Sequence, residues 1–263
     1  AQVLFCSVAR RGTIVMALRR VQIIAGQVPG PAAVACSGSD RIQDAFDKLA
    51  RAKVCAILRA KNTEVAIARG KELVDMGCKC IEVTLDSANW EKILSELLAY
   101  AGEKCVVGVG TVQDAAEVAR VAEVGGRFAL SPFNPEGFVA ECTRLGVLAV
   151  PAAFSPQEIV TAHKQGAKVM KVFPAQIYTP KTFKALKEIG MFSKLNLMPS
   201  GGVSPENLDE WFAAGAFGVG MGSNLAGDDI KVPPEQGEKL RAAQEKWVKS
   251  GRAIAQAVCD KFK

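Results

Sequence analysis

The sequence predicts an α/β fold, and within that class a single-domain (β/α)8 TIM barrel over residues 40–263. Three observations support this prediction. Short runs rich in β-branched residues alternate with helix-period segments along the chain. The length of 263 residues is close to the roughly 250 typical of such a barrel. A doubly wound open sheet fits less well, because no Gly-x-Gly-x-x-Gly turn follows the first strand.

Eight runs have the character of buried parallel strands, because each is short, largely apolar and bounded by a turn. They are Lys53–Leu58, Lys79–Leu85, Cys105–Gly108, Arg127–Leu130, Val147–Val150, Lys168–Phe173, Leu195–Met198 and Phe217–Met221.

Helix-period segments separate these runs, so that each strand is followed by a helix that leads back to the start of the next strand. Several of them begin with Ser, Asn or Thr before a proline, an order that the first turn of a helix favours. They are Glu64–Met76, Trp90–Ala101, Val112–Val124, Pro135–Leu145, Pro156–Gln165, Pro180–Ile189 and Pro205–Ala214.

A long last helix is expected from about Glu235 to Lys263. Leu240, Trp247 and Ile254 recur in it at intervals of seven residues. This spacing predicts an apolar stripe that packs across the barrel.

Residues 1–39 form a basic N-terminal extension that the barrel pattern does not include. They contain four arginines and no Asp, Glu or Lys, so they supply four of the six net positive charges. This composition resembles part of an organelle targeting segment, and a segment bound by a partner is the alternative. The protein is therefore expected in the cytoplasm, or in a chloroplast or mitochondrion if the extension is a targeting segment.

The composition disfavours several classes of protein. Acidic and basic residues nearly balance outside the extension, which argues against a nucleic-acid-binding surface. No apolar run approaches the roughly 20 residues that span a membrane. Cysteines in apolar strand-like runs indicate reduced, packed thiols and not a disulfide framework. His163 is the only histidine, which argues against a histidine-rich metal site and a histidine-activated nucleophile.

Lys171 interrupts the sixth expected strand, which is otherwise apolar. Because side chains alternate along a strand, Val169, Lys171 and Phe173 are expected on one face, with Met170 and Val172 on the other. Burial disfavours the charged ammonium and can lower a lysine pKa by roughly 3–5 units. A neutral lysine amine is a nucleophile that forms Schiff bases with carbonyl compounds. The alternative is a lysine whose ammonium reaches solvent from the strand end.

Other polar residues lie where expected strands end, which is where barrels of this kind place catalytic residues. In the second strand, Glu82 shares the inward face with Cys80 and Thr84, and a buried carboxylate is costly unless it is paired or used. Arg59 ends the first strand, and Thr111 follows the glycine-containing end of the third. Glu82, Arg59 and Thr111 are therefore candidate site residues.

Two glycine-containing turns predict a phosphate site. Residues 199–202, Pro-Ser-Gly-Gly, follow the seventh strand and lead into the helix expected at Pro205, while Gly222 and Ser223 follow the eighth strand. Exposed backbone N–H groups and a helix N-terminus both attract anions. Loops after strands seven and eight are the usual phosphate-binding loops of these barrels. A tight turn without a ligand is the alternative for each turn taken alone.

Five short motifs occur in order at the ends of expected strands. They are Glu82-Val83-Thr84-Leu85, Gly108-Val109-Gly110-Thr111-Val112, Lys171-Val172-Phe173-Pro174-Ala175, Pro199-Ser200-Gly201-Gly202-Val203 and Gly222-Ser223. Together they resemble the motifs of the 2-keto-3-deoxy-6-phosphogluconate (KDPG) aldolase family and of its phosphogalactonate branch. The resemblance covers roughly residues 40–260.

The resemblance implies a class I aldolase, a carbon–carbon lyase of the Entner-Doudoroff pathway that is normally a homotrimer and needs neither a metal nor a cofactor. It implies cleavage of KDPG to pyruvate and glyceraldehyde 3-phosphate. Lys171 would be the Schiff-base lysine and Glu82 the general acid and base. The other implied roles are carboxylate binding by Arg59 and Thr111, a substrate wall of Phe173 and Pro151, and phosphate binding by Ser200, Gly201, Gly202, Gly222 and Ser223.

Three positions depart from the family pattern. Asp86 stands where the phosphogluconate branch usually has arginine, which is closer to the galactonate branch and leaves the substrate carboxylate to Arg59 and Thr111. Asp86 is then expected to point toward solvent or a cation. After the fifth strand, Ala152 and Phe154 bring a methyl group and a phenyl ring to the mouth of the site, where the family typically has Pro-Gly followed by threonine.

Two other functions stay open from the sequence. The first is a related pyruvate-forming aldolase that acts on the galactonate epimer or on 4-hydroxy-2-oxoglutarate. The second is a catalytically weak barrel that serves as a structural or binding subunit of a larger assembly. The presence of both Lys171 and Glu82 argues against the second, because an idle barrel has no physical reason to bury both.

Overall fold

The computed structural model describes residues 37–263 of the chain. The interpretation of residues 1–39 as a targeting or partner-bound extension therefore lies almost entirely outside the described residues and stays a prediction.

Parallel strands form the centre of the described part. They are arranged in a six-stranded sheet of order β5-β4-β3-β2-β1-β9 and a three-stranded sheet of order β6-β7-β8. Every expected strand run overlaps one of them, and β6 is an additional short strand. Their bounds are β1 Val54–Leu58, β2 Cys80–Thr84, β3 Val106–Gly110, β4 Phe128–Leu130, β5 Leu148–Val150, β6 Ala152–Ala153, β7 Val169–Val172, β8 Asn196–Pro199 and β9 Val219–Met221.

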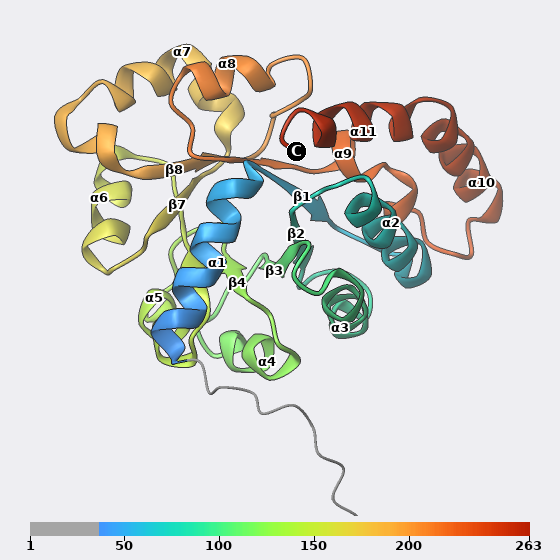
Figure 1. The fold of residues 1–263 in the computed structure, drawn as a ribbon, viewed down its shortest axis with the longest axis horizontal. Helices are drawn as coiled ribbons and strands as arrows, with labels where there is room; N and C mark the ends of the chain where they lie inside the picture. Colours follow the sequence, from blue (N-terminus) through green and yellow to red (C-terminus); the bar gives the residue numbers. More distant parts are fainter. Residues whose placement is uncertain (1–36) are drawn as a thin grey trace, which may run out of the picture. The chain divides into compact units, whose positions relative to one another are not determined.

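The two sheets adjoin each other at both edges. Only Pro151 separates β5 from β6 in the chain. A single parallel bridge between Ser200 and Gly220 links the end of β8 to β9. Figure 1 shows the resulting curled parallel sheet with helices around it. The predicted α/β class is therefore confirmed, while the strands pair as two sheets and not as one continuous eight-stranded barrel.

Helices follow the strands as expected, although several begin at other residues. The helix expected from Val112 begins at Glu117, because the Glu117 carboxylate accepts hydrogen bonds from the backbone of Gln113 and Asp114 and holds them in a turn. Between residues 37 and 263, every helix is too short or too polar to cross a membrane. The bounds are α1 Gly38–Ala52, α2 Thr63–Asp75, α3 Trp90–Ala101, α4 Glu117–Val124, α5 Phe138–Leu145, α6 Pro156–Lys164, α7 Ala175–Lys187, η1 Gly190–Lys194, α8 Leu208–Ala213, α9 Ser223–Ala226, η2 Asp229–Lys231, α10 Gly237–Lys246, η3 Trp247–Gly251 and α11 Arg252–Asp260.

Helix α1 was not predicted from the sequence. Ser37 caps it, because its hydroxyl accepts a hydrogen bond from the Asp40 N–H while the Asp40 carboxylate accepts one from the Ser37 N–H. The buried residues of α1 pack among inward-facing side chains of the strands, and α1 also contacts Arg127 and Phe217, which precede β4 and β9. Figure 1 shows α1, in blue, lying across the sheet. The helix therefore covers the N-terminal ends of the strands.

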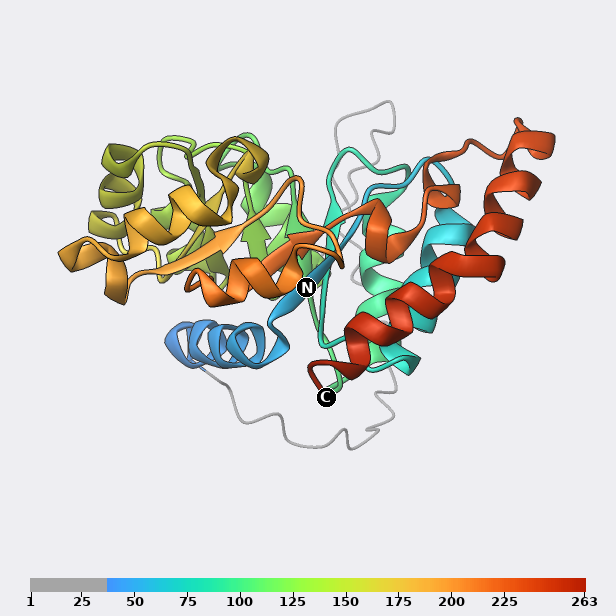
Figure 2. The same ribbon diagram turned by 90° about the horizontal axis from the view of Figure 1, so that it is seen from above.

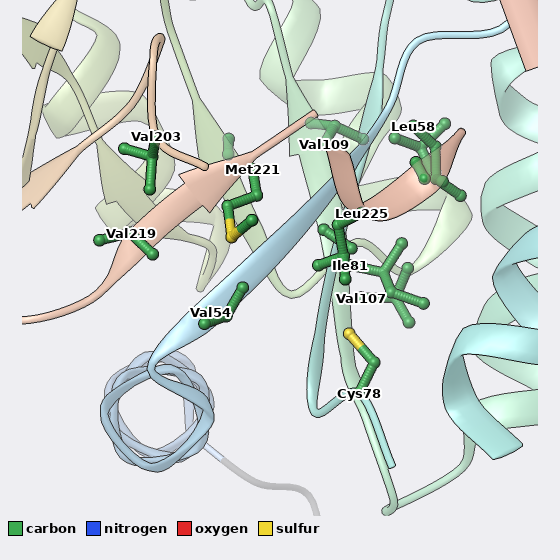
Figure 3. Close-up of a cluster of buried hydrophobic side chains, with 14 of the residues drawn as sticks. Val54, Leu58, Cys78, Ile81, Val107, Val109, Val203, Val219, Met221 and Leu225 are labelled. Atoms are coloured by element: carbon green, nitrogen blue, oxygen red, sulfur yellow. The ribbon is translucent and has the colours of Figure 1, made fainter. Parts of the chain in front are cut away.

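Buried apolar side chains form two clusters on opposite faces of the strands. The outer cluster lies between strands and helices, and Figure 3 shows part of it, including Ile81 and Val109. The inner cluster contains Cys80, Phe128 and Val169 together with the buried face of α1. The alternation predicted for β2 is thus observed, with Cys80 inside and Ile81 outside.

The C-terminal helix lies where it was expected, but its buried face differs from the prediction. Figure 2 shows α10, η3 and α11 following one another in red beside α2. Trp247 is buried, whereas Leu240 is half-buried and Ile254 is 41% exposed, so the predicted stripe is wrong beyond Trp247. The reason is that η3 is a π-helix, whose wider turn contains one more residue than an α-helical turn. The side chains of α11 are therefore rotated about the helix axis relative to those of α10. The buried residues after η3 are Ala255, Val258 and Cys259.

Candidate active site

A cavity of about 510 Å³ lies at the carboxyl ends of the strands, away from α1. All but one of the site residues predicted from the sequence line it. They come from the ends of β1, β2, β3, β7, β8 and β9 or from the loops that follow these strands. The predicted residues that line the cavity are Arg59, Glu82, Thr111, Lys171, Phe173, Ser200, Gly201, Gly202, Gly222 and Ser223.

Lys171 lies in β7 and is 6% exposed. Its backbone N–H donates to the carbonyl oxygen of Pro151 at 2.9 Å, which fixes the strand at this point. The amine Nζ lies 4.9 Å from the centre of the Phe173 ring. Val169, two residues earlier, belongs to the inner cluster, so the alternation predicted for this strand is observed. The amine therefore points into the space that the curled sheet encloses, and it reaches the cavity.

Glu82 lies in β2 and is 1% exposed. Its Oε2 has no hydrogen-bond partner among the described residues. Burial raises the pKa of Glu82, and the positive charges of Lys171 and Arg59 partly oppose this rise. Gly110 leaves room for the carboxyl group, since a Cβ at that position would overlap Glu82 Oε1. A buried carboxyl oxygen without a partner is costly, so this oxygen is available to a bound molecule.

Arg59 lies at the rim of the cavity, where it contacts two side chains. Its Nη2 donates to Thr111 Oγ1 at 3.1 Å, and its Nη1 forms an ion pair with Asp86. Asp86 therefore points toward a cation, as expected from the sequence. Thr111 has a φ of +64°, an unfavourable value for a β-branched residue that is consistent with a functional position. The guanidinium and the Thr111 hydroxyl together can bind a carboxylate.

The turn after β8 has a backbone shape that glycine adopts most easily. The φ angles of Gly201 and Gly202 are +88° and +80°. A Cβ on either residue would lie 2.8 or 2.7 Å from the side chain of Gln176, so both backbone strain and crowding exclude larger residues. The Ser200 carbonyl oxygen accepts a hydrogen bond from the Ala175 N–H at 2.8 Å, which ties the turn to α7. Backbone groups thus line this end of the cavity.

The helix expected to begin at Pro205 begins instead at Leu208. The side chain of Asn207 explains the difference, because it accepts from the Ser204 N–H and donates to the Gly202 carbonyl oxygen, both at 2.9 Å. These bonds hold the preceding residues in a turn. The helix N-terminus that was predicted to help bind phosphate is therefore set back from the glycine turn.

Pro151 does not line the cavity, although it was predicted as a substrate wall. It is a buried residue between β5 and β6 whose carbonyl oxygen accepts from Lys171. Ala152 and Phe154 line a neighbouring hollow of about 550 Å³ that shares Phe173 with the cavity. They therefore lie beside the cavity and do not line it.

Sequence reasoning missed several lining residues, and Lys231 is the charged one among them. Its Nζ contacts the hydroxyl of Ser223 and lies 3.7 Å from the carboxylate of Asp228. No local pattern marks it, since lysines in loops ordinarily face solvent. The other missed lining residues are Ile57, Pro132, Val203, Gly220 and Asn224.

Within residues 37–263, no group of three or more His, Cys, Asp or Glu side chains is arranged to hold a metal ion. The cysteines in this range are free and buried, as predicted for packed thiols. Burial raises the pKa of the Cys142 thiol to about 12, which keeps it protonated and unreactive.

The family model and the curated relatives of this chain indicate one family. The family model described as KDPG and KHG aldolase matches residues 46–236. The chain is 31% identical over 183 residues to the 2-dehydro-3-deoxy-6-phosphogalactonate aldolase of Escherichia coli K12, a match that covers 69% of this chain and 89% of that protein. It is 31% identical over 186 residues to the 2-dehydro-3-deoxy-phosphogluconate aldolase of Pseudoalteromonas atlantica, covering 70% and 84%. The fold resembles that of the KDPG aldolase from Legionella pneumophila, solved with pyruvate captured at low pH as a covalent carbinolamine intermediate. The TM-score is 0.67 at 23% identity over 81% of this chain and 97% of that one.

Proposed function

This chain belongs to the KDPG and KHG aldolase family and is thus a lyase, and we propose that it is a class I aldolase acting on a phosphorylated 2-keto-3-deoxy sugar acid. The substrate we propose is KDPG, with pyruvate and glyceraldehyde 3-phosphate as products. One observation supports this above all others: a buried lysine and a buried carboxyl oxygen without a partner line the same cavity. These are the nucleophile and the acid–base group that Schiff-base chemistry needs.

The first half of the proposed reaction forms the imine. Lys171, as the neutral amine, attacks the C2 ketone and gives a carbinolamine. Glu82 donates a proton to the carbinolamine hydroxyl, which leaves as water, and an iminium ion remains. The raised pKa of Glu82 supports this role, because the group then holds a proton closer to neutral pH. The carbinolamine captured in the Legionella enzyme is the corresponding intermediate in a protein of the same fold.

The second half breaks the C3–C4 bond. Glu82, now a carboxylate, removes the proton of the C4 hydroxyl. The electrons of the C3–C4 bond move to the iminium nitrogen, C4 becomes the aldehyde of glyceraldehyde 3-phosphate, and an enamine stays on Lys171. Protonation of this enamine at C3 and hydrolysis by water release pyruvate and the free amine.

Two ends of the cavity would hold the two anionic ends of the substrate. Arg59 and Thr111 lie together at the rim, where they would bind the carboxylate. The turns at Gly201 and Gly222 line the same cavity, and their backbone groups would bind the phosphate. Binding at both ends would orient the substrate with C2 near Lys171.

The galactonate epimer is the second candidate substrate, and one observation favours it. Position 86 carries an aspartate that pairs with Arg59, where the phosphogluconate branch usually has an arginine. Arg59 is therefore the arginine that remains to bind the substrate carboxylate. The relative from Escherichia coli is named for the galactonate substrate. Cleavage of 4-hydroxy-2-oxoglutarate by the same Schiff-base steps would need no phosphate contact.

The family also supports two structural proposals. The bridge between Ser200 and Gly220 and the short gap at Pro151 support a closed (β/α)8 barrel in the protein. A homotrimer is the assembly that the family resemblance implies. A catalytically weak structural subunit is disfavoured, because Lys171 and Glu82 occupy a shared cavity that such a subunit would not need.

Reduction by borohydride in the presence of pyruvate tests the proposed function. We expect intact mass to show one reduced pyruvate adduct, and peptide mapping to place it on Lys171. Lys171→Met should fold and form no adduct, because an unbranched apolar side chain suits a buried position.

Lys168→Met is the matched control. Lys168 lies just before the same strand, is exposed and bonds to Gln43, so its replacement should leave the adduct intact. An adduct on any other lysine, or none with the parent protein, would contradict the proposal.

A further inference from the structure

We propose that Lys231 is a charged part of the phosphate-binding site, and that it makes this protein select phosphorylated over unphosphorylated sugar acids. The inference rests on the proposed function, because it assumes that the anionic end of the substrate lies at the glycine turns. Lys231 lines the same cavity as Lys171 and Glu82, although it is 60 residues farther along the chain than Lys171.

The position of the Lys231 ammonium suits an anion at the Gly222–Ser223 turn. Its Nζ contacts the Ser223 hydroxyl, and its side chain is 45% exposed, so it lies at the rim of the cavity. A serine hydroxyl can accept a hydrogen bond from an ammonium and donate its own proton to a third group. Lys231 and Ser223 can therefore both present hydrogens to one phosphate, and hydrogen bonds with charged partners are the stronger ones.

The rest of this end of the cavity supplies little full positive charge. The turn at Gly201 and Gly202 offers backbone groups, and α8 begins too late to direct its N-terminus there. Arg59 is engaged with Asp86 at the carboxylate end. Of the cavity-lining residues that the structure describes, Lys231 is the cation beside the glycine turns. A phosphate dianion at this place would therefore meet its counter-charge in Lys231.

A buried ion pair that the proposed chemistry does not use holds Lys231 in place. Asp229, at the start of η2, accepts two hydrogen bonds from the guanidinium of Arg69 in α2, at 2.9 and 3.1 Å. Both side chains are less than 5% exposed. The Trp247 ring from the C-terminal helix covers the guanidinium, with its centre 3.3 Å away. These contacts fix η2, and η2 ends at Lys231.

A second connection joins η2 to the loop that follows Arg59. The carbonyl oxygen of Ile230 accepts hydrogen bonds from the backbone N–H groups of Lys61 and Asn62, at 2.8 and 3.3 Å. Lys231 is the next residue after Ile230, and Arg59 lies two residues before Lys61. Arg59 and Lys231, which we propose bind the two ends of the substrate, therefore lie in segments that are hydrogen-bonded to each other. These hydrogen bonds restrict the distance between the two residues.

Steady-state cleavage of KDPG and of unphosphorylated 2-keto-3-deoxygluconate tests this inference. For Lys231→Met we expect KM for KDPG to rise about tenfold, equivalent to about 1.4 kcal/mol, with kcat within about twofold. KM for the unphosphorylated acid and the rate of borohydride-trapped pyruvate adduct should not change. Lys231→Arg should recover most of the affinity, because it keeps the charge.

Lys239→Met is the matched control. Lys239 is an exposed lysine that lines a neighbouring groove together with Ser223 and Asp228, but it does not line the cavity. Its replacement removes the same charge without removing a residue that lines the cavity, so KM for KDPG should stay near the parent value. Equal effects of the two lysine variants, or equal changes with both substrates, would overturn the assignment of Lys231.

Binding of inorganic phosphate separates this inference from the proposed function. If the parent protein cleaves no sugar-acid phosphate, the proposed function fails, and calorimetric titration with inorganic phosphate still tests Lys231. Binding by the parent that weakens about tenfold in Lys231→Met supports the inference. Unchanged binding in the variant, or no binding by the parent, refutes it.

Discussion

Glu82 has a buried carboxyl group whose surroundings favour the protonated form and leave one oxygen without a partner. Such an arrangement destabilises the fold, because a buried polar atom loses its hydrogen bonds to water and gains none in return. Gly110 preserves the space for this carboxyl group even though glycine is a poor strand residue. A position that serves the proposed chemistry at the expense of stability would have these features.

We expect Glu82→Gln to lower kcat roughly 10²–10⁴-fold, the usual contribution of a positioned acid or base. Glutamine keeps the shape of the side chain but cannot exchange a proton at these steps. Steady-state cleavage of KDPG measures the loss. Turnover close to that of the parent would mean that Glu82 has no acid–base role.

The same variant should be more stable than the parent at neutral pH. Because the folded-state pKa of Glu82 is raised, the folded protein binds this proton more tightly than the unfolded chain, and stability falls as pH rises from the ordinary pKa through the raised one. Glutamine does not ionise, so the variant does not lose stability in this way as the pH rises. Urea unfolding should show the full gain in stability above the raised pKa and a smaller gain at about pH 4, where the carboxyl group is mostly protonated in both the folded and the unfolded state. A gain of equal size at both values of pH would argue against a raised pKa.

Arg59 and Asp86 should respond in opposite ways to substitution. Arg59→Ala removes the guanidinium that we propose for the substrate carboxylate and should raise KM for both the gluconate and the galactonate phosphates, by about tenfold or more. Asp86→Ala frees that guanidinium from its ion pair and should leave KM unchanged or lower it. Kinetics of the three proteins with both substrates check this. If Arg59→Ala has the same KM as the parent protein, the substrate carboxylate binds elsewhere.

Among the elements, η2 is short but strongly fixed. It has three residues, yet it joins α2, the loop after β1 and the C-terminal helix through Arg69, Lys61 and Trp247. A buried ion pair does not stabilise a protein more than apolar packing would, because both charges lose their hydration. Its effect here is to hold a short segment in one position.

We expect Asp229→Ala to lower the free energy of unfolding by about 3–5 kcal/mol, because it leaves the Arg69 charge buried without a partner. Urea unfolding measures the change. Asp209→Ala is the control, since Asp209 is 75% exposed and its pair with Lys261 should contribute less than about 1 kcal/mol. If both variants lose a similar amount of unfolding free energy, burial does not determine how much these two ion pairs contribute to stability.

Within the described part of the molecule, α1 and the cavity of the proposed site lie at opposite ends of the strands. Helix α1 contacts residues that precede β4 and β9, whereas residues at the carboxyl ends of the strands line the cavity. Leu49 of α1 is 3% exposed and packs in the inner cluster. Substitutions at the two ends should therefore have separable effects.

Leu49→Ala should lower the free energy of unfolding by about 2–5 kcal/mol and leave KM for KDPG unchanged, because the cavity it creates is remote from the site. Arg51→Ala, at an exposed position of the same helix, should change stability by less than about 0.5 kcal/mol. Urea unfolding and steady-state kinetics check both variants. A changed KM in Leu49→Ala would show that the two ends are coupled.

The sequence by itself determined the features that depend on neighbouring residues. Strand and helix alternation follows from hydrophobic periodicity, which is local, and all eight expected strands were found. Lys171 and Glu82 could be singled out because a charge within an apolar strand is visible without any knowledge of the fold. The turn at Gly201 and Gly202 could be recognised because a positive φ favours glycine wherever it occurs.

Only the tertiary structure decided the features that depend on residues far apart in the chain. Arg69 and Asp229, which position Lys231, are 160 residues apart, and no local pattern joins them. The Asn207 side chain delayed the start of α8, and the π-helix η3 rotated the buried face of the C-terminal helix. Each of these outcomes depends on competition among hydrogen bonds and packing contacts that exist only once the chain has folded, so periodicity and spacing could not predict them.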